Sequence, residues 1–108
     1  MITLKGTSFY QSTIKGLKNW SLGILRLEPN NQYDSEACAV YVEEELVGYL
    51  EKGWKEEDWG EEMLTYINNP QREGHISLRK VGGYNMDNGE VATEGLRLIT
   101  KKDLHERI

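Results

Sequence analysis

Residues 37–50 read ACAVYVEEELVGYL, two apolar runs separated by acidic residues. The runs predict two β-strands, Ala37–Glu43 and Glu45–Leu50, and the acidic pair Glu43-Glu44 predicts the turn between them. Cys38 falls on the apolar face of the first run, because every second residue of a strand shares a face. We therefore expect an antiparallel hairpin in which Cys38 is a small buried side chain rather than a reactive thiol.

Further strands are predicted on both sides of this hairpin, where apolar residues recur at short intervals. These strands are Ile2–Tyr10, Trp20–Glu28, His75–Val81 and Gly95–Thr100. Both faces of Trp20–Glu28 are largely apolar, which is typical of a strand covered on both sides. We accordingly expect the rings of Trp20, Trp54 and Trp59 to lie in the core or to plug the ends of a barrel.

One principal helix is predicted over Trp54–Asn68, where apolar residues recur at helical spacing and Pro70 follows the end. Gln11–Lys18 is compatible with a short helical turn, and Lys101–Ile108 reads as a polar tail that frays or ends in a short helix. A mobile loop is expected between Gly82-Gly83 and Asp87-Asn88-Gly89. About six strands around one helix favour a small antiparallel β-barrel, since closure removes exposed strand edges.

The chain has 108 residues, which suits a single domain spanning 1–108. Its formal net charge is −5, but the acidity is local. Residues 43–62 hold nine acids and two lysines, whereas the other residues hold 11 bases and nine acids. Binding along a duplex needs many lysines and arginines. The charge pattern therefore favours weak or end-specific contact with a nucleic acid over strong duplex binding.

Several function classes find no support in the composition. No apolar run approaches the roughly 20 residues needed to span a bilayer, and the N-terminus does not read as a signal peptide. One cysteine forms no internal disulfide, which leaves the cytoplasm as the default compartment. Two histidines and one cysteine lack metal-ligand spacing and make no catalytic set. We therefore expect neither an enzyme nor a cofactor.

The most specific stretch is Leu27–Tyr41, LEPNNQYDSEACAVY, followed at once by Leu46–Lys52, LVGYLEK. Together they resemble the HIRAN family signature: an acid-Pro-x-Asn-x-Tyr-Asp loop, a small-residue strand, and a Val-Gly-Tyr/His-Leu strand followed by a basic residue. The opening Gly6-Thr7-Ser8-Phe9-Tyr10 is similar to the first strand of that family. The resemblance implies an OB-like barrel and a module that binds the free 3′ end of single-stranded DNA.

Carried onto this chain, the resemblance assigns the DNA contacts to three segments and one late aromatic residue. These residues are Phe9 and Tyr10, then Asn30, Asn31 and Asp34, then Tyr49 and Lys52, and finally Tyr84. The chain departs from the pattern at Ser8, which stands where the DNA-binding member has an arginine. The chemistry is coherent: rings stack on bases, a carboxylate accepts a hydrogen bond from a terminal hydroxyl, and Lys52 supplies one positive charge.

Two other interpretations remain open at this stage. The first is local: Asn30 to Asp34 form a turn in which Asp34 caps the following amides, Tyr33 packs, and one ring of the Phe9-Tyr10 pair is core. The second is functional: the acidic helix docks on a basic protein partner, and the chain binds no nucleic acid.

Overall fold

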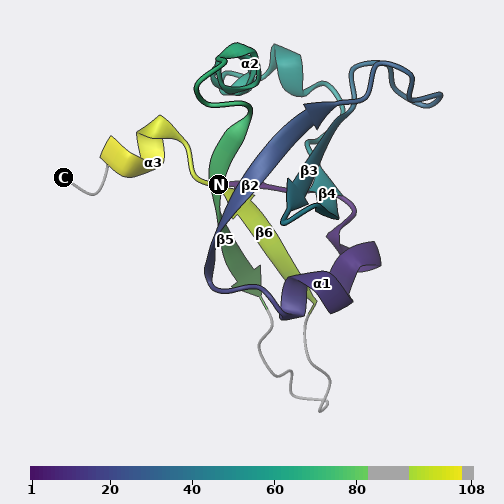
Figure 1. Ribbon diagram of the computed structural model, residues 1–108, viewed down its shortest axis with the longest axis vertical. Coiled ribbons are helices and arrows are strands. Elements are labelled where there is room, and N and C mark those ends of the chain that lie inside the picture. Colours follow the sequence, from purple (N-terminus) through teal and green to yellow (C-terminus); the bar gives the residue numbers. More distant parts are fainter. Residues whose placement is uncertain (83–92, 106–108) are drawn as a thin grey trace.

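Six antiparallel strands form one curled sheet in the computed structural model, which describes residues 1–82 and 93–105. The order across the sheet is β1-β6-β5-β2-β3-β4. Figure 1 shows the sheet wrapped between helix α1 at the bottom and helix α2 at the top. The prediction of a mainly β, OB-like fold with one principal helix is confirmed. The strands are β1 (Ile2–Thr3), β2 (Trp20–Leu27), β3 (Cys38–Val42), β4 (Glu45–Tyr49), β5 (His75–Gly82) and β6 (Glu94–Leu98).

The predicted hairpin is confirmed as β3 and β4. Glu43 and Glu44 form its two-residue turn, with φ of 51° and 71°. Positive φ at both central positions matches the right-handed twist of the strands, although asparagine and glycine adopt it at lower cost. Cys38 is fully buried, as expected, and burial raises the pKa of its thiol to about 12.

The two edges of the sheet meet where Lys5 pairs with Tyr49. The backbone of these residues exchanges two hydrogen bonds, of 2.8 and 3.0 Å. Gly48 makes this approach possible, because a Cβ atom there would lie 2.9 Å from the carbonyl oxygen of Lys5. The N-terminal segment therefore closes the curled sheet against β4.

The predicted strand over Ile2–Tyr10 is wrong beyond Thr3. Gly6 adopts φ of 74°, a left-handed conformation that ends the extended chain. The 3₁₀ turn η1 (Thr7–Tyr10) and helix α1 (Gln11–Lys15) follow. The Gln11 side chain ties α1 to β6, since it donates to the Glu94 carbonyl (2.7 Å) and accepts from the Glu94 amide (2.9 Å).

The predicted single helix over Trp54–Asn68 is wrong, because the segment forms two pieces. These are the 3₁₀ turn η2 (Trp54–Glu56) and α2 (Gly60–Asn68), separated at Glu57, whose ψ of 155° is extended. The pieces pack closely, since a Cβ on Gly60 would lie 2.3 Å from the Trp54 carbonyl oxygen. The break at Glu57 thus separates Trp54, which is buried, from α2.

The core lies inside the curl and is built from strand and helix residues along the whole described chain. It includes Leu4, Ile14, Leu25, Val40, Val47, Trp54, Met63, Ile76 and Leu98. Trp59 is half-buried against it, whereas Trp20 is 44% exposed and Leu22 is 59% exposed. The prediction that both faces of β2 are covered is therefore wrong, and so is the assignment of Trp20 to the core.

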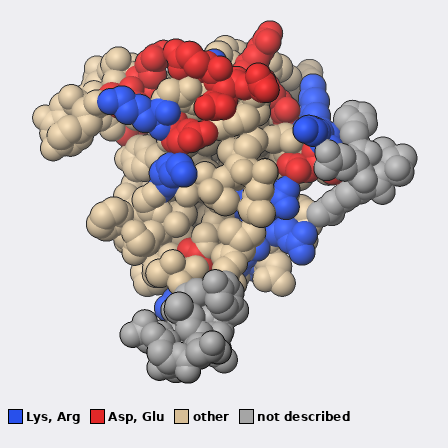
Figure 2. Space-filling model, turned by 180° about the vertical axis from the view of Figure 1, so that it is seen from behind, with Lys and Arg blue, Asp and Glu red and all other residues tan. Residues whose placement is uncertain are grey.

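The acidic side chains gather along the edge of the molecule that carries η2 and α2, at the top of Figure 2. Helix α3 (Lys101–His105) forms within the predicted polar tail, as one of the two expectations for that segment stated. The expected loop after Gly82 lies outside the described residues. Among the residues described, no helix is long and apolar enough to cross a membrane.

Candidate nucleic-acid interface

The loop between β2 and β3 is held by the side chain of Asn31. Its Oδ1 accepts hydrogen bonds from the amides of Tyr33 (2.9 Å) and Asp34 (3.1 Å), and its Nδ2 donates to Glu28 (3.0 Å). This is the asparagine-centred turn that residues of this type favour. Asn31 therefore organises the loop, with one Nδ2 hydrogen committed to Glu28.

Asn30 and Asp34 are less committed to the loop than Asn31. Asp34 is half-buried, and its Oδ1 accepts from the Glu36 amide at 3.0 Å, as the capping interpretation expected. Within the described part of the chain, Asp34 Oδ2 has no hydrogen-bond partner. The side chain of Asn30 is exposed. The loop thus presents one carboxylate oxygen and one amide for contact with another molecule.

Glu28, for which no role was predicted from the sequence, joins the loop to β4. Its Oε1 accepts from Asn31, and its Oε2 accepts from the Tyr49 hydroxyl at 3.4 Å. Burial raises the pKa of Tyr49, and the neighbouring Glu28 carboxylate raises it further. The signal for Glu28 was the acid that precedes Pro29 in the quoted motif. The Asn31–Glu28–Tyr49 chain holds the loop beside the end of β4.

The aromatic pair of η1 lies next to the same strand, since η1 packs against β4. Phe9 is 84% exposed, and Tyr10 is half-buried against the core. One ring of the pair is therefore core, as expected, although a helical turn rather than strand alternation separates the two. Tyr10 also lies close enough to Tyr49 to contribute to its raised pKa.

Tyr33 is a further candidate for contact with a partner. It was predicted to pack, but 83% of the residue is exposed. The neighbouring Asp34 carries the carboxylate oxygen without a hydrogen-bond partner. The Tyr33 amide donates a hydrogen bond to Asn31 Oδ1, which fixes the backbone there. An aromatic ring with this exposure gains little from burial and is available to stack on a partner.

The remaining predicted residues are placed as follows. Lys52 follows β4 and is exposed, as is Ser8 in η1. Tyr84 lies outside the described residues. The structure therefore joins the 28–37 loop to Tyr49 through Glu28 and packs η1 against β4, with Lys52 three residues beyond Tyr49.

The far end of the loop is anchored to the core by Trp54. The indole Nε1 donates to the Glu36 carbonyl at 2.8 Å, and only 1% of Trp54 is exposed. Lys55 adds an ion pair to Glu36 at 3.1 Å. The loop is consequently fixed at both ends, by Glu28 and by Glu36.

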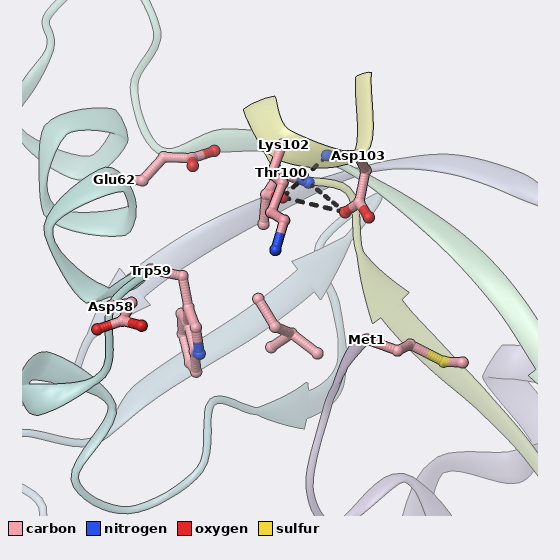
Figure 3. Close-up of a pocket in the computed structure, with 8 residues that line it drawn as sticks. Met1, Asp58, Trp59, Glu62, Thr100, Lys102 and Asp103 are labelled. Atoms are coloured by element: carbon pink, nitrogen blue, oxygen red, sulfur yellow. Dashed lines mark hydrogen bonds between the residues drawn. The ribbon is translucent and has the colours of Figure 1, made fainter. Parts of the chain in front are cut away.

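A hollow in the described part of the chain lies elsewhere, between α2, α3 and the N-terminus (Figure 3). It measures about 400 Å³ and is lined by Trp59, Asp58, Glu62 and Lys102, among others. Asp103 at its rim accepts hydrogen bonds from Thr100, which lower the pKa of its carboxyl. The 28–37 loop does not line this hollow, so the candidate interface is an exposed surface.

No group of three or more potential metal ligands occurs among the described residues. A protein-family model described as the HIRAN domain matches residues 1–57. That stretch spans β1 to η2 and includes the whole 28–37 loop and β4. No curated protein and no solved structure matches the chain.

Proposed function

Because this chain belongs to the HIRAN family, whose domains bind DNA, we propose that it is a non-catalytic module for single-stranded DNA with a free 3′-hydroxyl end. The rings of Phe9 and Tyr33 stack on terminal bases, and Asp34 accepts a hydrogen bond from the terminal hydroxyl. Asn30 and Lys52 contact the phosphates, while Tyr10, Asn31 and Tyr49 hold the surface in shape.

The observation that carries this proposal is the position of Glu28. Its two carboxylate oxygens hold Asn31 on one side and Tyr49 on the other. The loop with Asp34 is thereby kept beside the strand against which η1 packs. Stacking on an exposed ring contributes about 1–3 kcal/mol per base, which is enough for a weak, end-specific contact.

The local charge supports recognition of a hydroxyl rather than of a phosphate. Glu28, Asp34 and Glu36 lie on one loop, opposed there by the Lys55 ion pair. A terminal phosphate placed against Asp34 meets a like charge, whereas a hydroxyl donates a hydrogen bond to it. Few phosphates are contacted, so the affinity should depend only weakly on salt.

The test compares two six-nucleotide strands labelled at the 5′ end, one with a 3′-hydroxyl and one with a 3′-phosphate. We expect fluorescence anisotropy to show tighter binding of the hydroxyl form by about tenfold, the factor that corresponds to 1.4 kcal/mol. Asp34→Ala should abolish this preference. The exposed Asp58, far along the chain, provides the control Asp58→Ala, which should retain it. Equal binding of both strands, unchanged by Asp34→Ala, would overturn the proposal.

The acidic edge in Figure 2 favours a second candidate function, which is docking on a basic protein. Three exposed acids lie in this region: Glu56 in η2, Glu57 directly after it, and Glu61 in α2. Charge reversal of these three residues should then abolish capture of a basic partner while leaving oligonucleotide binding intact. Capture that survives the reversal would refute this second function.

A further inference from the structure

The outer face of β2 is open to solvent. Leu25 and Gly23 point into the core, so the alternate residues Trp20, Leu22 and Arg26 point outward. Trp20 is 44% exposed and Leu22 is 59% exposed. Figure 1 shows α1 and α2 at the two ends of the sheet rather than along this strand.

Two arginines lie over aromatic rings on this face. The Arg79 guanidinium is 5.3 Å from the centre of the Trp20 ring, and β5 pairs these two residues directly across the strands. The Arg26 guanidinium is 4.9 Å from the centre of the Tyr41 ring. Both arginines are exposed. Trp20 and Arg26 are six residues apart on β2, which corresponds to about 20 Å of strand.

The charge of this face is opposite to that of the molecule as a whole. The ionisable residues that the described parts of β2 and β5 direct outward are Arg26, His75 and Arg79. Glu43, in the hairpin turn, is an acid that lines the same groove of about 500 Å³ as Trp20 and Leu22. A protein of net charge −5 therefore carries basic side chains and rings together on one open sheet face.

We propose that this face, defined by Trp20, Leu22, Arg26, Tyr41 and Arg79, is a track for the part of the single strand that precedes its bound 3′ end. The proposal rests on the function proposed above and extends the contact beyond the terminal nucleotides. Rings with adjacent guanidinium groups provide stacking and phosphate contact at once, the combination that binds single strands without sequence preference.

The track is continuous with the end-binding surface. Arg26 pairs with Ala39, and Ala39 pairs with Tyr49, across neighbouring strands, so Tyr49 lies on the face that carries Arg26. Tyr49 is also the residue that Glu28 joins to the 28–37 loop. Charge also distinguishes the occupants: a single strand brings phosphates to Arg26 and Arg79, whereas a basic peptide is repelled. A single strand leaving the loop therefore meets Tyr41 and Arg26 first, and then Leu22 and Trp20.

The experiment compares a 3-nucleotide strand with a 12-nucleotide strand, the latter with either a 3′-hydroxyl or a 3′-phosphate. The 3-nucleotide strand reports the end surface, and the phosphorylated 12-mer reports the track with the contact to Asp34 weakened. We expect Trp20→Ala and Arg79→Ala each to weaken binding of both 12-mers by about tenfold. Neither substitution should change the affinity for the 3-nucleotide strand. Lys101→Ala, which removes an exposed charge on α3, is the matched control and should change nothing.

Trp20 provides a second readout that does not depend on affinity. The 12-mers should quench the fluorescence of Trp20. Trp54 is buried, and Trp59 lines the hollow beside α3 rather than the groove beside Trp20, so these two rings contribute a constant background. Trp20→Phe keeps a stacking ring, so it should retain the affinity for the 12-mers and lose the quenching. This variant also separates a binding role of the ring from a role in stability.

The outcomes distinguish the two proposals. If the 3-nucleotide strand binds but Trp20→Ala and Arg79→Ala leave the affinity for the 12-mers unchanged, the track is refuted and the end surface stands. If the phosphorylated 12-mer binds through Trp20 and Arg79 while the 3-nucleotide strand does not bind, the track stands and the end surface is refuted. If an acidic peptide quenches Trp20 and no oligonucleotide does, the face binds protein and the track is refuted.

Discussion

The 28–37 loop and the outer face of β2 both expose large side chains, but they are held in opposite ways. In the loop, Asn31 and Glu28 hold the polar groups through hydrogen bonds within the loop and to Tyr49. On β2, the backbone is fixed by its two neighbouring strands, and the outward side chains stand clear of the core. The loop is shaped by its side chains, whereas the face is shaped by its backbone.

Substitutions in the two regions should therefore have different effects on the structure. Removal of a side chain from the loop changes the conformation of the binding surface itself. Removal of a side chain from the face of β2 changes only what that side chain contacts, because the ladder beneath it persists. Stability should therefore respond strongly at the loop anchors and weakly at the exposed face.

The largest effect is expected where the loop meets the core. Trp54→Ala removes a ring that is 1% exposed and the hydrogen bond to the Glu36 carbonyl, so the free energy of unfolding should fall by about 3–5 kcal/mol. Trp20→Ala should lower it by less than about 1 kcal/mol. Urea denaturation followed by circular dichroism measures both. Equal losses at the two tryptophans would show that the β2 face is supported by contacts like those of the loop.

An intermediate effect is expected within the loop. Asn31→Ala removes three side-chain hydrogen bonds, and the free energy of unfolding should fall by about 1–2 kcal/mol. Asn30→Ala, one residue away at an exposed position, is the matched control and should have almost no effect. Hydrogen exchange at the Tyr33 and Asp34 amides should accelerate only in Asn31→Ala. Unchanged exchange there would contradict the loop's dependence on its side chains.

The smallest effect concerns the link between the loop and β4. Glu28→Gln removes the charge that helps to raise the pKa of Tyr49, so this pKa should move down toward 10. A tyrosine whose pKa is raised by folding stabilises the native state fully below its ordinary pKa, and this contribution is lost as pH rises through the folded value. The substitution should thus reduce the pH dependence of stability above pH 10.

Nuclear magnetic resonance of the tyrosine rings measures this shift site by site. Tyr66 supplies an internal control, because burial and Glu62 raise its pKa to about 12 and Glu28 takes no part. Its titration should be the same in Glu28→Gln as in the native protein. A Tyr49 titration that does not move would show that the loop and β4 are uncoupled.

The parts of the fold with clear alternation were predictable from the sequence. The hairpin of β3 and β4, strand β5 and most of β2 follow the expected ranges closely. The prediction of a strand over Ile2–Tyr10 failed at Gly6, where the backbone turns left-handed and the extended chain ends. The prediction of one helix over Trp54–Asn68 failed at Glu57. The helical spacing of apolar residues does not reveal that Trp54 belongs to a separate 3₁₀ turn.

The candidate site was predictable in its residue types but less so in their roles. The motif identified Asn31 and Tyr49, yet the hydrogen bonds that join them run through Glu28. Tyr33 and Trp20 were expected to pack, because large rings usually do, and both are exposed. Burial depends on what covers a residue in three dimensions, and the alternation within a single strand does not specify that cover.

The meeting of Lys5 with Tyr49 has a consequence for self-association. A sheet with two free edges offers two templates on which strands of other molecules add. Here a single backbone pair, allowed by the missing side chain of Gly48, turns these edges toward each other. We therefore expect a larger side chain at Gly48 to part the two edges and to promote association between copies of the chain.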